Sequence, residues 1–245
     1  MDLLKLKIDR FAYNEGRFEI KSLGGQKISV GNGEKIAVIG PSGCGKSTLL
    51  KIISGLEKNF EGNMELIGKT AFVLQEYGLF PWKKVYHNIA LPLKLEKMKK
   101  ENIEKRVEDI ATTLGINEIL NKYPDSISGG QKQRVAIGRA LVTSPNLLLL
   151  DEPFNSLDSL TREGIQDMVL EIADKKNMSF IIVTHNIEES VYMADRVLIM
   201  DKNGNNEFMK IERGNSTNKE FRNTKLYYEQ VNTLREKLKN SMKGR

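Results

Sequence analysis

The sequence contains 245 residues, of which 40 % are hydrophobic and 29 % are charged. This length suits one large domain, or one domain with an inserted subdomain, that folds without disulfides or structural metals. The single cysteine, Cys44, excludes an internal disulfide, and one cysteine with two histidines is too few for a four-ligand zinc site. No run approaches the roughly 18 apolar residues that cross a bilayer, and the start is too charged for a secretory signal. We therefore expect a chain of a reducing compartment that neither crosses a membrane nor is exported.

Most of the net charge of +6 lies near the C-terminal end, where residues 219–245 hold eight basic and three acidic side chains. The rest of the chain is nearly neutral, so there is no distributed basic face of the kind that tracks a phosphate backbone. Tyr227, Val231, Leu234 and Leu238 recur at helical spacing and predict an amphipathic helix. This basic segment could contact an anionic lipid surface or nucleic acid, but we expect a solvated terminal helix and no nucleic acid partner.

Alternating apolar residues open the chain. Leu4, Leu6 and Ile8 share one face, and Phe18 and Ile20 repeat the pattern. A period of two predicts half-buried strands, which we expect to be antiparallel.

The rest of the chain alternates between apolar runs and helical patterns. Residues 35–39 predict a buried strand that leads into a glycine-rich loop and then a helix beginning near Lys46. From about residue 85 to 145 only helical spacing is found. Further strands are predicted at 72–74, 146–150, 179–183 and 196–200. The fold class is therefore α/β, with a parallel-sheet core, an antiparallel patch at the start and a helical insert.

The glycine-rich loop matches the phosphate-binding pattern G-x-x-x-x-G-K-[ST] in its required position between a strand and a helix. Glycines let the backbone approach an anion, and the N–H groups of the loop and of the following helix point at it. Lys46 would place its charge on the β- and γ-phosphates, and Ser47 would offer a hydroxyl to Mg²⁺. The small side chain of Cys44 could be a neutral filler, or its pKa could be lowered by the helix N-terminus. The candidate phosphate-binding residues are Gly40, Pro41, Ser42, Gly43, Cys44, Gly45, Lys46, Ser47 and Thr48.

Two acids follow the apolar run 147–150. Ligands of open α/β sheets bind at the carboxyl ends of strands, which predicts that Asp151 holds Mg²⁺. Glu152 points differently and can polarise a water molecule.

A second glycine-rich helix start is formed by Ser128, Gly129, Gly130 and Gln131. Its N–H groups and the Ser128 hydroxyl can also grip phosphate oxygens, although such a segment can equally be a plain helix cap.

The order of these motifs resembles that of the ATP-binding cassette (ABC) ATPases. The stretch from Ser128 resembles the family's signature motif, Gln75 its Q-loop glutamine, residues 155–158 its D-loop with Asp158, and His185 its switch histidine. Asn155 and Ser156 are unusual in a D-loop. Tyr13 lies where the family places an aromatic ring against adenine. Phe11 and Phe18 are rivals for that role, and each of the three rings could instead be core packing.

The resemblance implies a P-loop NTPase (RecA-like) fold. The implied division is an ATP-binding core over 1–84 and 146–216, a helical subdomain over 85–145 that carries the signature, and a basic tail over 217–245.

The resemblance also implies the mechanism, with ATP and Mg²⁺ as cofactors. Two copies pack head to tail, so that ATP on Lys46 of one copy is capped by Ser128 and Gly130 of the other. Glu152 is implied as general base, Lys46 and His185 as contacts of the γ-phosphate, and Gln75 as a contact of Mg²⁺ or water.

The loop 77–82, which holds Phe80 and Trp82, could be a core loop or the rim of a groove for a helix of a membrane subunit. The segment from Gln75 onward resembles the ATPases of importers for nitrate, sulfonate, taurine, bicarbonate and thiamine precursors. The implied protein is a peripheral ATPase subunit on the cytoplasmic face of the membrane, beside a permease and, indirectly, an extracytoplasmic solute-binding protein. A soluble ABC ATPase of DNA repair or translation, an export ATPase and a P-loop switch or kinase are the alternatives.

Overall fold

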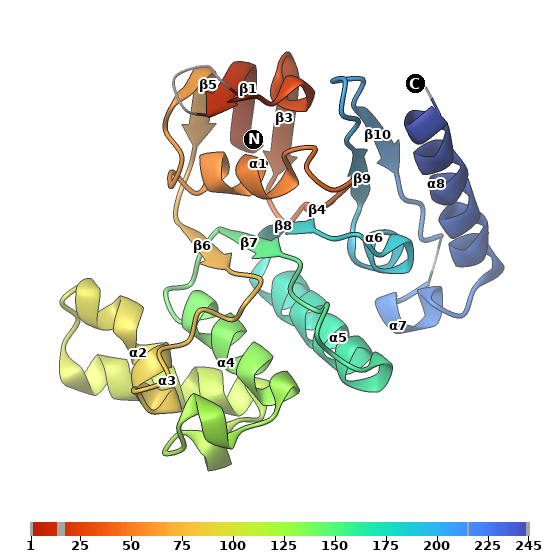
Figure 1. Cartoon of the computed structure of the whole chain (residues 1–245). Helices are drawn as coiled ribbons and strands as arrows, with labels where there is room; N and C mark the ends of the chain where they lie inside the picture. The colour runs from red at the N-terminus through yellow and green to blue at the C-terminus, as the bar shows by residue number, and fades with distance from the viewer. Residues whose placement is uncertain (1, 14–17, 215, 244–245) are drawn as a thin grey trace.

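A computed structural model describes residues 2–13, 18–214 and 216–243 and contains two sheets, shown in Figure 1. The larger sheet has the strand order β10-β9-β4-β8-β7-β6, in which β10 runs antiparallel to β9 and all other neighbours are parallel. Its strands are β4 (Lys35–Ile39), β6 (Thr70–Val73), β7 (Leu147–Asp151), β8 (Ser179–Val183), β9 (Arg196–Ile199) and β10 (Glu207–Lys210).

The smaller sheet is antiparallel and is built around β1, which pairs with all three other strands. Leu6 lies opposite Ile28 on one side and Met64 on the other. Its strands are β1 (Asp2–Tyr13), β2 (Phe18–Glu19), β3 (Gln26–Gly31) and β5 (Phe60–Leu66). Ile20, which was predicted to continue a strand, instead caps the short 3₁₀ helix η1 (Lys21–Leu23).

The larger sheet separates two hydrophobic clusters, because successive side chains of a strand point to opposite faces. On β7, Leu147 and Leu149 pack toward the antiparallel sheet and α1, whereas Leu148 and Leu150 pack toward the other helices. All four are fully buried. Burial on both faces explains why these strands are continuous apolar runs in the sequence.

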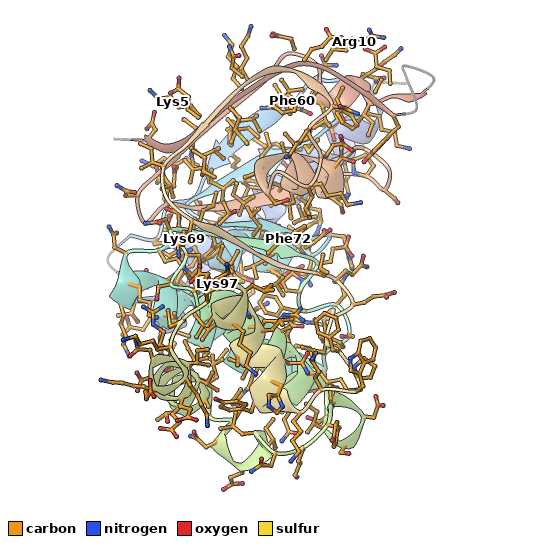
Figure 2. All side chains as sticks on the ribbon, turned by 90° about the vertical axis from the view of Figure 1, so that its left-hand side faces the viewer. Lys5, Arg10, Phe60, Lys69, Phe72 and Lys97 are labelled. Carbon is orange, nitrogen blue, oxygen red and sulfur yellow. The ribbon has the colours of Figure 1, made fainter. Side chains whose placement is uncertain are left out.

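The helices are α1 (Lys46–Ile53), α2 (Val85–Leu95), α3 (Lys100–Leu114), α4 (Gly129–Leu141), α5 (Ser159–Lys176), α6 (Ile187–Met193), α7 (Asn218–Phe221) and α8 (Lys225–Lys243). Two further 3₁₀ turns are η2 (Asn117–Ile119) and η3 (Pro124–Ser126). Figure 1 shows α2, α3 and α4 grouped away from the antiparallel strands. Figure 2 shows Lys5, Arg10 and Phe60 at the antiparallel end, with Lys69 and Phe72 between them and the helical segment. Within the described ranges, no helix is long and apolar enough to cross a membrane.

The predicted α/β fold with an antiparallel patch and inserted helices is confirmed, but three strands were missed, β3, β5 and β10. β3 alternates buried and exposed side chains and was passed over between two glycine turns. In β5 the apolar residues Phe60, Met64 and Leu66 alternate with polar ones, but Gly62, with a φ of +144°, interrupts the pattern. β10 is a four-residue edge strand with one buried side chain, Met209, and forms through its pairing with β9.

The predicted C-terminal helix is confirmed as α8, and it is not fully solvated. Tyr227, Val231, Leu234 and Leu238 are all buried, and α8 packs against α6. The Arg235 guanidinium lies 2.9 Å from the Glu188 carboxylate of α6. The apolar face of the helix is thus part of the core, and several of its basic side chains are paired.

We expect Leu234→Ala to lower the free energy of unfolding by about 2–4 kcal/mol, because Leu234 has no exposed surface and truncation leaves a cavity. Urea unfolding monitored by circular dichroism measures the change. Lys239→Ala, on the exposed face of the same helix, is the control and should change stability little. Equal stability of the two variants would show that α8 does not dock in solution.

Candidate active site

Four adjacent parallel strands end at one edge of the larger sheet, and a candidate functional residue follows each of them. The glycine-rich loop follows β4, and the segment with His185 follows β8. Asp151 is the last residue of β7 and Glu152 comes directly after it, while Gln75 lies after β6. The carboxyl ends of parallel strands lie side by side, so these residues from distant parts of the chain meet.

The glycine-rich loop wraps closely around the Lys46 side chain. The Lys46 ammonium donates hydrogen bonds to the carbonyl oxygens of Gly40 at 2.9 Å and Pro41 at 3.0 Å. Gly45 has a φ of +98°, and a Cβ there would lie 2.8 Å from Ile20 Cγ2, so this position requires glycine. The loop is pre-shaped, with its N–H groups at the start of α1.

A cavity of about 700 Å³ opens above this loop. Tyr13 lines it and its hydroxyl lies 2.9 Å from Thr48 Oγ1. Phe11 is buried in the core and packs edge-on against Tyr13, with ring centroids 4.8 Å apart. The Phe18 side chain lies outside the described residues. The cavity is lined by Tyr13, Ile20, Gly40, Ser42, Gly43, Gly45, Lys46, Ser47, Thr48, Gln75, Glu152 and His185.

Ile20 is the cavity residue that sequence reasoning missed. In the sequence, Ile20 follows Phe18 at a spacing of two and was therefore predicted only as a strand residue. Ile20 lies beside Gly45 because the antiparallel sheet folds over the glycine-rich loop.

Ser47 and Asp151 form a polar pair at the floor of the site. Ser47 Oγ donates to Asp151 Oδ1 at 3.0 Å. Burial raises the pKa of the Asp151 carboxyl, against the lowering effect of the Ser47 hydrogen bond. A hydroxyl and a desolvated carboxylate beside a phosphate loop are hard oxygen donors and fit Mg²⁺, which usually takes one or two protein oxygens together with phosphates and water.

Three side chains approach a single oxygen of the Glu152 carboxylate, Oε2. Gln75 Nε2 lies 3.4 Å away and His185 Nδ1 3.5 Å away, and Asn155 Nδ2 donates to the same oxygen. Glu152 has a φ of +46°, a conformation that few residues other than glycine adopt, and its N–H donates to Val183 O at 2.9 Å. The turn aims the carboxylate into the cavity.

The signature residues lie outside this cavity. Ser128 caps α4, where its hydroxyl accepts from the Gln131 N–H at 3.3 Å and its own N–H donates to Gln131 Oε1 at 3.0 Å. Asp158 caps α5, and the hydrogen bond from Thr161 N–H holds the pKa of the Asp158 carboxyl below its usual range. Ser128, Gly129, Gly130, Gln131 and Asp158 are therefore not brought to Lys46 within one chain.

A set of loop contacts was not foreseen from the sequence. The Arg139 guanidinium of α4 donates to the carbonyl oxygens of Gly78 at 2.6 Å and Tyr77 at 2.9 Å. The Tyr77 hydroxyl lies 2.6 Å from Ser156 Oγ. These contacts join the segment after Gln75 to α4 and to the turn after Glu152.

The loop 77–82 is in part a core loop and in part exposed. Tyr77 and Leu79 pack against the core, whereas Trp82 is 70 % exposed. The fully buried Asn88 holds the loop, since its side chain bonds the Phe80 N–H at 2.8 Å and the Lys83 carbonyl at 2.9 Å. A core role is excluded for Trp82, which is presented to the surface.

Cys44 is a buried filler. Its side chain is 2 % exposed, and burial raises the pKa of its thiol. The start of α1 does act to lower this pKa through the Lys46 charge and the backbone N–H groups of Lys46 and Cys44, but desolvation by burial outweighs them, so the net shift predicted from the helix N-terminus is wrong.

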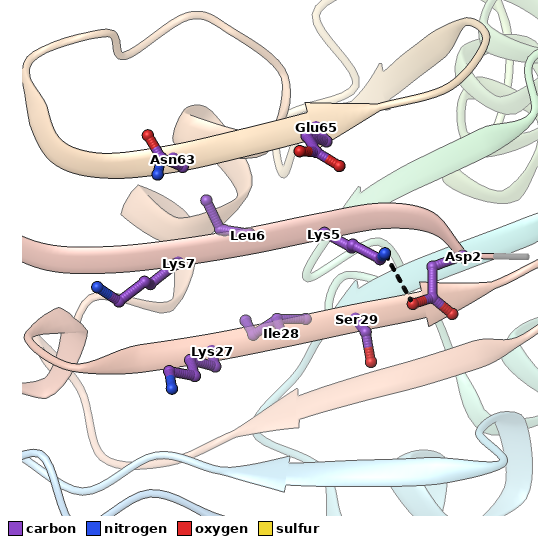
Figure 3. A pocket seen from close by; sticks show the side chains of 9 residues that line it. All are labelled: Asp2, Lys5, Leu6, Lys7, Lys27, Ile28, Ser29, Asn63 and Glu65. Atoms are coloured by element: carbon purple, nitrogen blue, oxygen red, sulfur yellow. Dashed lines mark ion pairs between the residues drawn. The ribbon is translucent and has the colours of Figure 1, made fainter.

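A second hollow, of about 340 Å³, lies on the antiparallel sheet (Figure 3). Lys5, Lys7, Lys27 and Glu65 stand at alternate positions of β1, β3 and β5, and Lys5 pairs with Asp2 at 3.9 Å. It has no glycine loop and no helix start, so it is the polar outer face of a sheet rather than a phosphate site.

Comparison with known proteins identifies the class. A family described as "ABC transporter" matches residues 23–155. The chain belongs to this family, and the prediction of an ABC ATPase, which binds ATP and couples its hydrolysis to transport, is confirmed.

Among the curated relatives are import ATP-binding proteins. The chain is 43 % identical over 205 residues to the aliphatic sulfonates import ATP-binding protein SsuB of Bacillus licheniformis, covering 80 % of this chain and 79 % of the relative. It is 40 % identical over 200 residues to SsuB 2 of Pseudomonas syringae pv. tomato, covering 80 % and 82 %. A solved structure of the ATP-binding cassette MJ0796, dimeric in a post-hydrolysis state with ADP and Pi bound, matches with a TM-score of 0.76 and 30 % identity. That match covers 85 % of this chain and 99 % of the other.

A buried carboxyl group lies on α6, the helix that follows His185. Glu189 is 4 % exposed on α6 and accepts a hydrogen bond from Gln166 Nε2 at 2.9 Å. Burial raises the pKa of Glu189 above its ordinary value of 4.5, although hydrogen bonds from Thr184 and Gln166 and the charges of Arg162 and His185 oppose it. The folded chain thus binds this proton more tightly than the unfolded chain, and the contribution to stability falls as pH rises from about 4.5 through the folded pKa.

We expect Glu189→Gln to remove this fall, because glutamine keeps the acceptor for Gln166 and carries no charge. As pH rises from about 4.5, the ordinary pKa of this carboxyl, to neutral pH, the variant should lose less unfolding free energy than the wild type. Urea unfolding across this range tests it, with the exposed Glu236→Gln as control. Parallel pH curves for Glu189→Gln and the wild type would refute the assignment.

Proposed function

We propose that this chain is the ATP-hydrolysing subunit of an importer for aliphatic sulfonates. The observation that carries the solute class is the identity of 43 % to an aliphatic sulfonates import ATPase over four-fifths of the chain. The alternatives of a soluble ABC ATPase in DNA repair or translation, and of an export ATPase, receive no support from these relatives.

We propose that Glu152 acts as general base or orients the attacking water. Its carboxylate faces the cavity that Lys46 and His185 line. Lys46 and His185 would contact the γ-phosphate, and Gln75 would contact Mg²⁺ or water. Phosphoryl transfer needs positioning and charge stabilisation, and these side chains supply both. Tyr13, at the mouth of the same cavity, would stack on adenine.

Ser47 and Asp151, with Gln75 nearby, would hold Mg²⁺. The ion would neutralise charge on the β- and γ-phosphates when bound. Asp151 would be kept ionised by that charge, whereas burial alone favours its protonated form.

We propose a head-to-tail dimer, because the second phosphate-binding group is remote from the first in a single chain. Ser128, Gly129, Gly130 and Gln131 would cap the ATP held by Lys46 of the other copy, with Asp158 at the same interface. Two positive helix ends would then clamp one polyanion, and separation of the products would weaken the interface.

We propose that the exposed part of the loop 77–82, with Trp82, meets the permease. Large exposed aromatic side chains are the usual anchors of helix-in-groove contacts. The chain would sit peripherally on the cytoplasmic face, and a solute-binding protein would act through the permease. The ATP-binding core would be 1–84 and 146–216, the helical subdomain 85–145 and the tail 217–245.

We expect Glu152→Gln to keep ATP binding, lose turnover by about 100-fold or more, and trap the closed dimer. Glutamine keeps the shape of the side chain but cannot accept the proton of water. Phosphate release and size-exclusion chromatography with Mg²⁺-ATP measure the two effects. Glu65→Gln, exposed on β5, is the control, and unchanged turnover in Glu152→Gln would remove Glu152 from this role.

The solute class is tested by uptake. In cells that encode this chain, its deletion should abolish uptake of a radiolabelled alkanesulfonate, and the wild-type chain should restore it. Lys46→Ala should not restore it, because the phosphates lose their main positive contact. If alkanesulfonate uptake persists while uptake of another anion is lost, the sulfonate assignment is wrong and the ABC transporter function stands.

A further inference from the structure

The turn after Glu152 carries the side-chain amide of Asn155, which has no role in the proposed binding and hydrolysis of ATP. Asn155 lies three residues after Glu152, and its side-chain amide donates to Glu152 Oε2. We propose that Asn155 is a positioning residue that holds the Glu152 carboxylate ready for hydrolysis. This inference rests on the proposed role of Glu152.

The turn that carries Asn155 is held on both sides. Phe154 is 1 % exposed and Leu157 is 6 % exposed, so both anchor the turn in the core. The Leu157 N–H donates to the Phe154 carbonyl at 3.2 Å, and the Arg162 guanidinium donates to the Leu157 carbonyl at 2.7 Å. The Asn155 amide therefore stands on a fixed piece of backbone.

The other two neighbours of the Glu152 carboxylate have competing tasks. Gln75 and His185 approach Oε2 at 3.4 and 3.5 Å, and neither contact is short. With nucleotide bound, the proposed partners of these two side chains are Mg²⁺ and the γ-phosphate. Within the part of the chain that the structure describes, the Asn155 amide makes no other hydrogen bond, and it lies on the same turn as Glu152, so it can keep its contact when the other two leave.

Hydrogen bonds hold the Glu152 carboxylate through one of its two oxygens, Oε2. The amides of Gln75 and Asn155 donate to Oε2 and His185 Nδ1 lies 3.5 Å from it, whereas no hydrogen bond within the described part of the chain is made to Glu152 Oε1. A carboxylate fixed through one oxygen presents the other to water. Because Glu152 sits on a turn of positive φ, its backbone is set but its side chain still needs an external contact to choose one rotamer.

The test compares Asn155→Ala with Asn155→Asp in the full chain, by steady-state ATP hydrolysis with Mg²⁺. Asn155→Ala should lower kcat by about tenfold, the scale of a lost hydrogen bond to a charged group, and change KM for ATP by less than about twofold. Asn155→Asp removes the donor and adds a like charge, so the acid limb of its kcat–pH profile should move to higher pH. Asn102→Ala, an exposed amide on α3, is the matched control.

Comparing Asn155→Ala in the wild-type chain and in the Glu152→Gln variant tests whether Asn155 acts through Glu152. In Glu152→Gln, the further change Asn155→Ala should leave the residual turnover and the ATP-dependent dimerisation unchanged. An equal loss of turnover in both backgrounds, or a weakened dimer, would overturn the proposal, since Asn155 would then act apart from Glu152. If Glu152→Gln keeps its turnover, the proposed role of Glu152 is wrong. If Glu152→Gln loses turnover but Asn155→Ala keeps it, only the positioning role of Asn155 is wrong.

Discussion

The parallel pairing of β4, β8, β7 and β6 is the constraint on which the site depends. The four strands are far apart in the sequence, yet their carboxyl ends are adjacent in space, so Lys46, Gln75, Glu152 and His185 line one cavity. Asp151 lies beside that cavity through its hydrogen bond with Ser47. Apolar packing on both faces of the sheet fixes the strands. The loops can therefore carry strained or polar chemistry, such as the positive φ of Glu152, without loss of position.

The polar groups of the site satisfy one another in the structure described. Lys46 bonds two carbonyl oxygens of its own loop, Ser47 bonds Asp151, and Gln75 and His185 approach Glu152. A buried donor or acceptor without a partner would cost about 1–3 kcal/mol. Nucleotide binding is then an exchange of partners within a prepared cradle rather than the assembly of a new site.

The sequence predicted those features that depend on residues close together in the chain. The glycine loop, the buried strand before Asp151 and the helical spacing of α8 follow from rules that act within about ten residues. Some missed features are local, since β3 alternates buried and exposed side chains between two glycine turns. Others are tertiary. β5 is interrupted by Gly62 and is held by its pairing with β1, and Arg139 holds Tyr77 and Gly78 because α4 packs beside that loop. The choice among the aromatic rings also needed the fold, since Phe11 and Tyr13 lie on the same face of β1 and differ in that Phe11 is buried in the core whereas Tyr13 lines the cavity.

The helix α4 connects the segment that begins at Ser128 with the loop that follows Gln75. Its first turn carries Ser128 as cap, and its last turn carries Arg139, which grips the loop that begins at Gln75 and ends at the exposed Trp82. A helix does not stretch, so displacing its N-terminus displaces the Arg139 guanidinium as well. Because that guanidinium is partly desolvated and bonded to two backbone carbonyls, releasing the loop would leave its donors unpaired. The Ser128 cap and the segment after Gln75 are thus joined through α4 and Arg139.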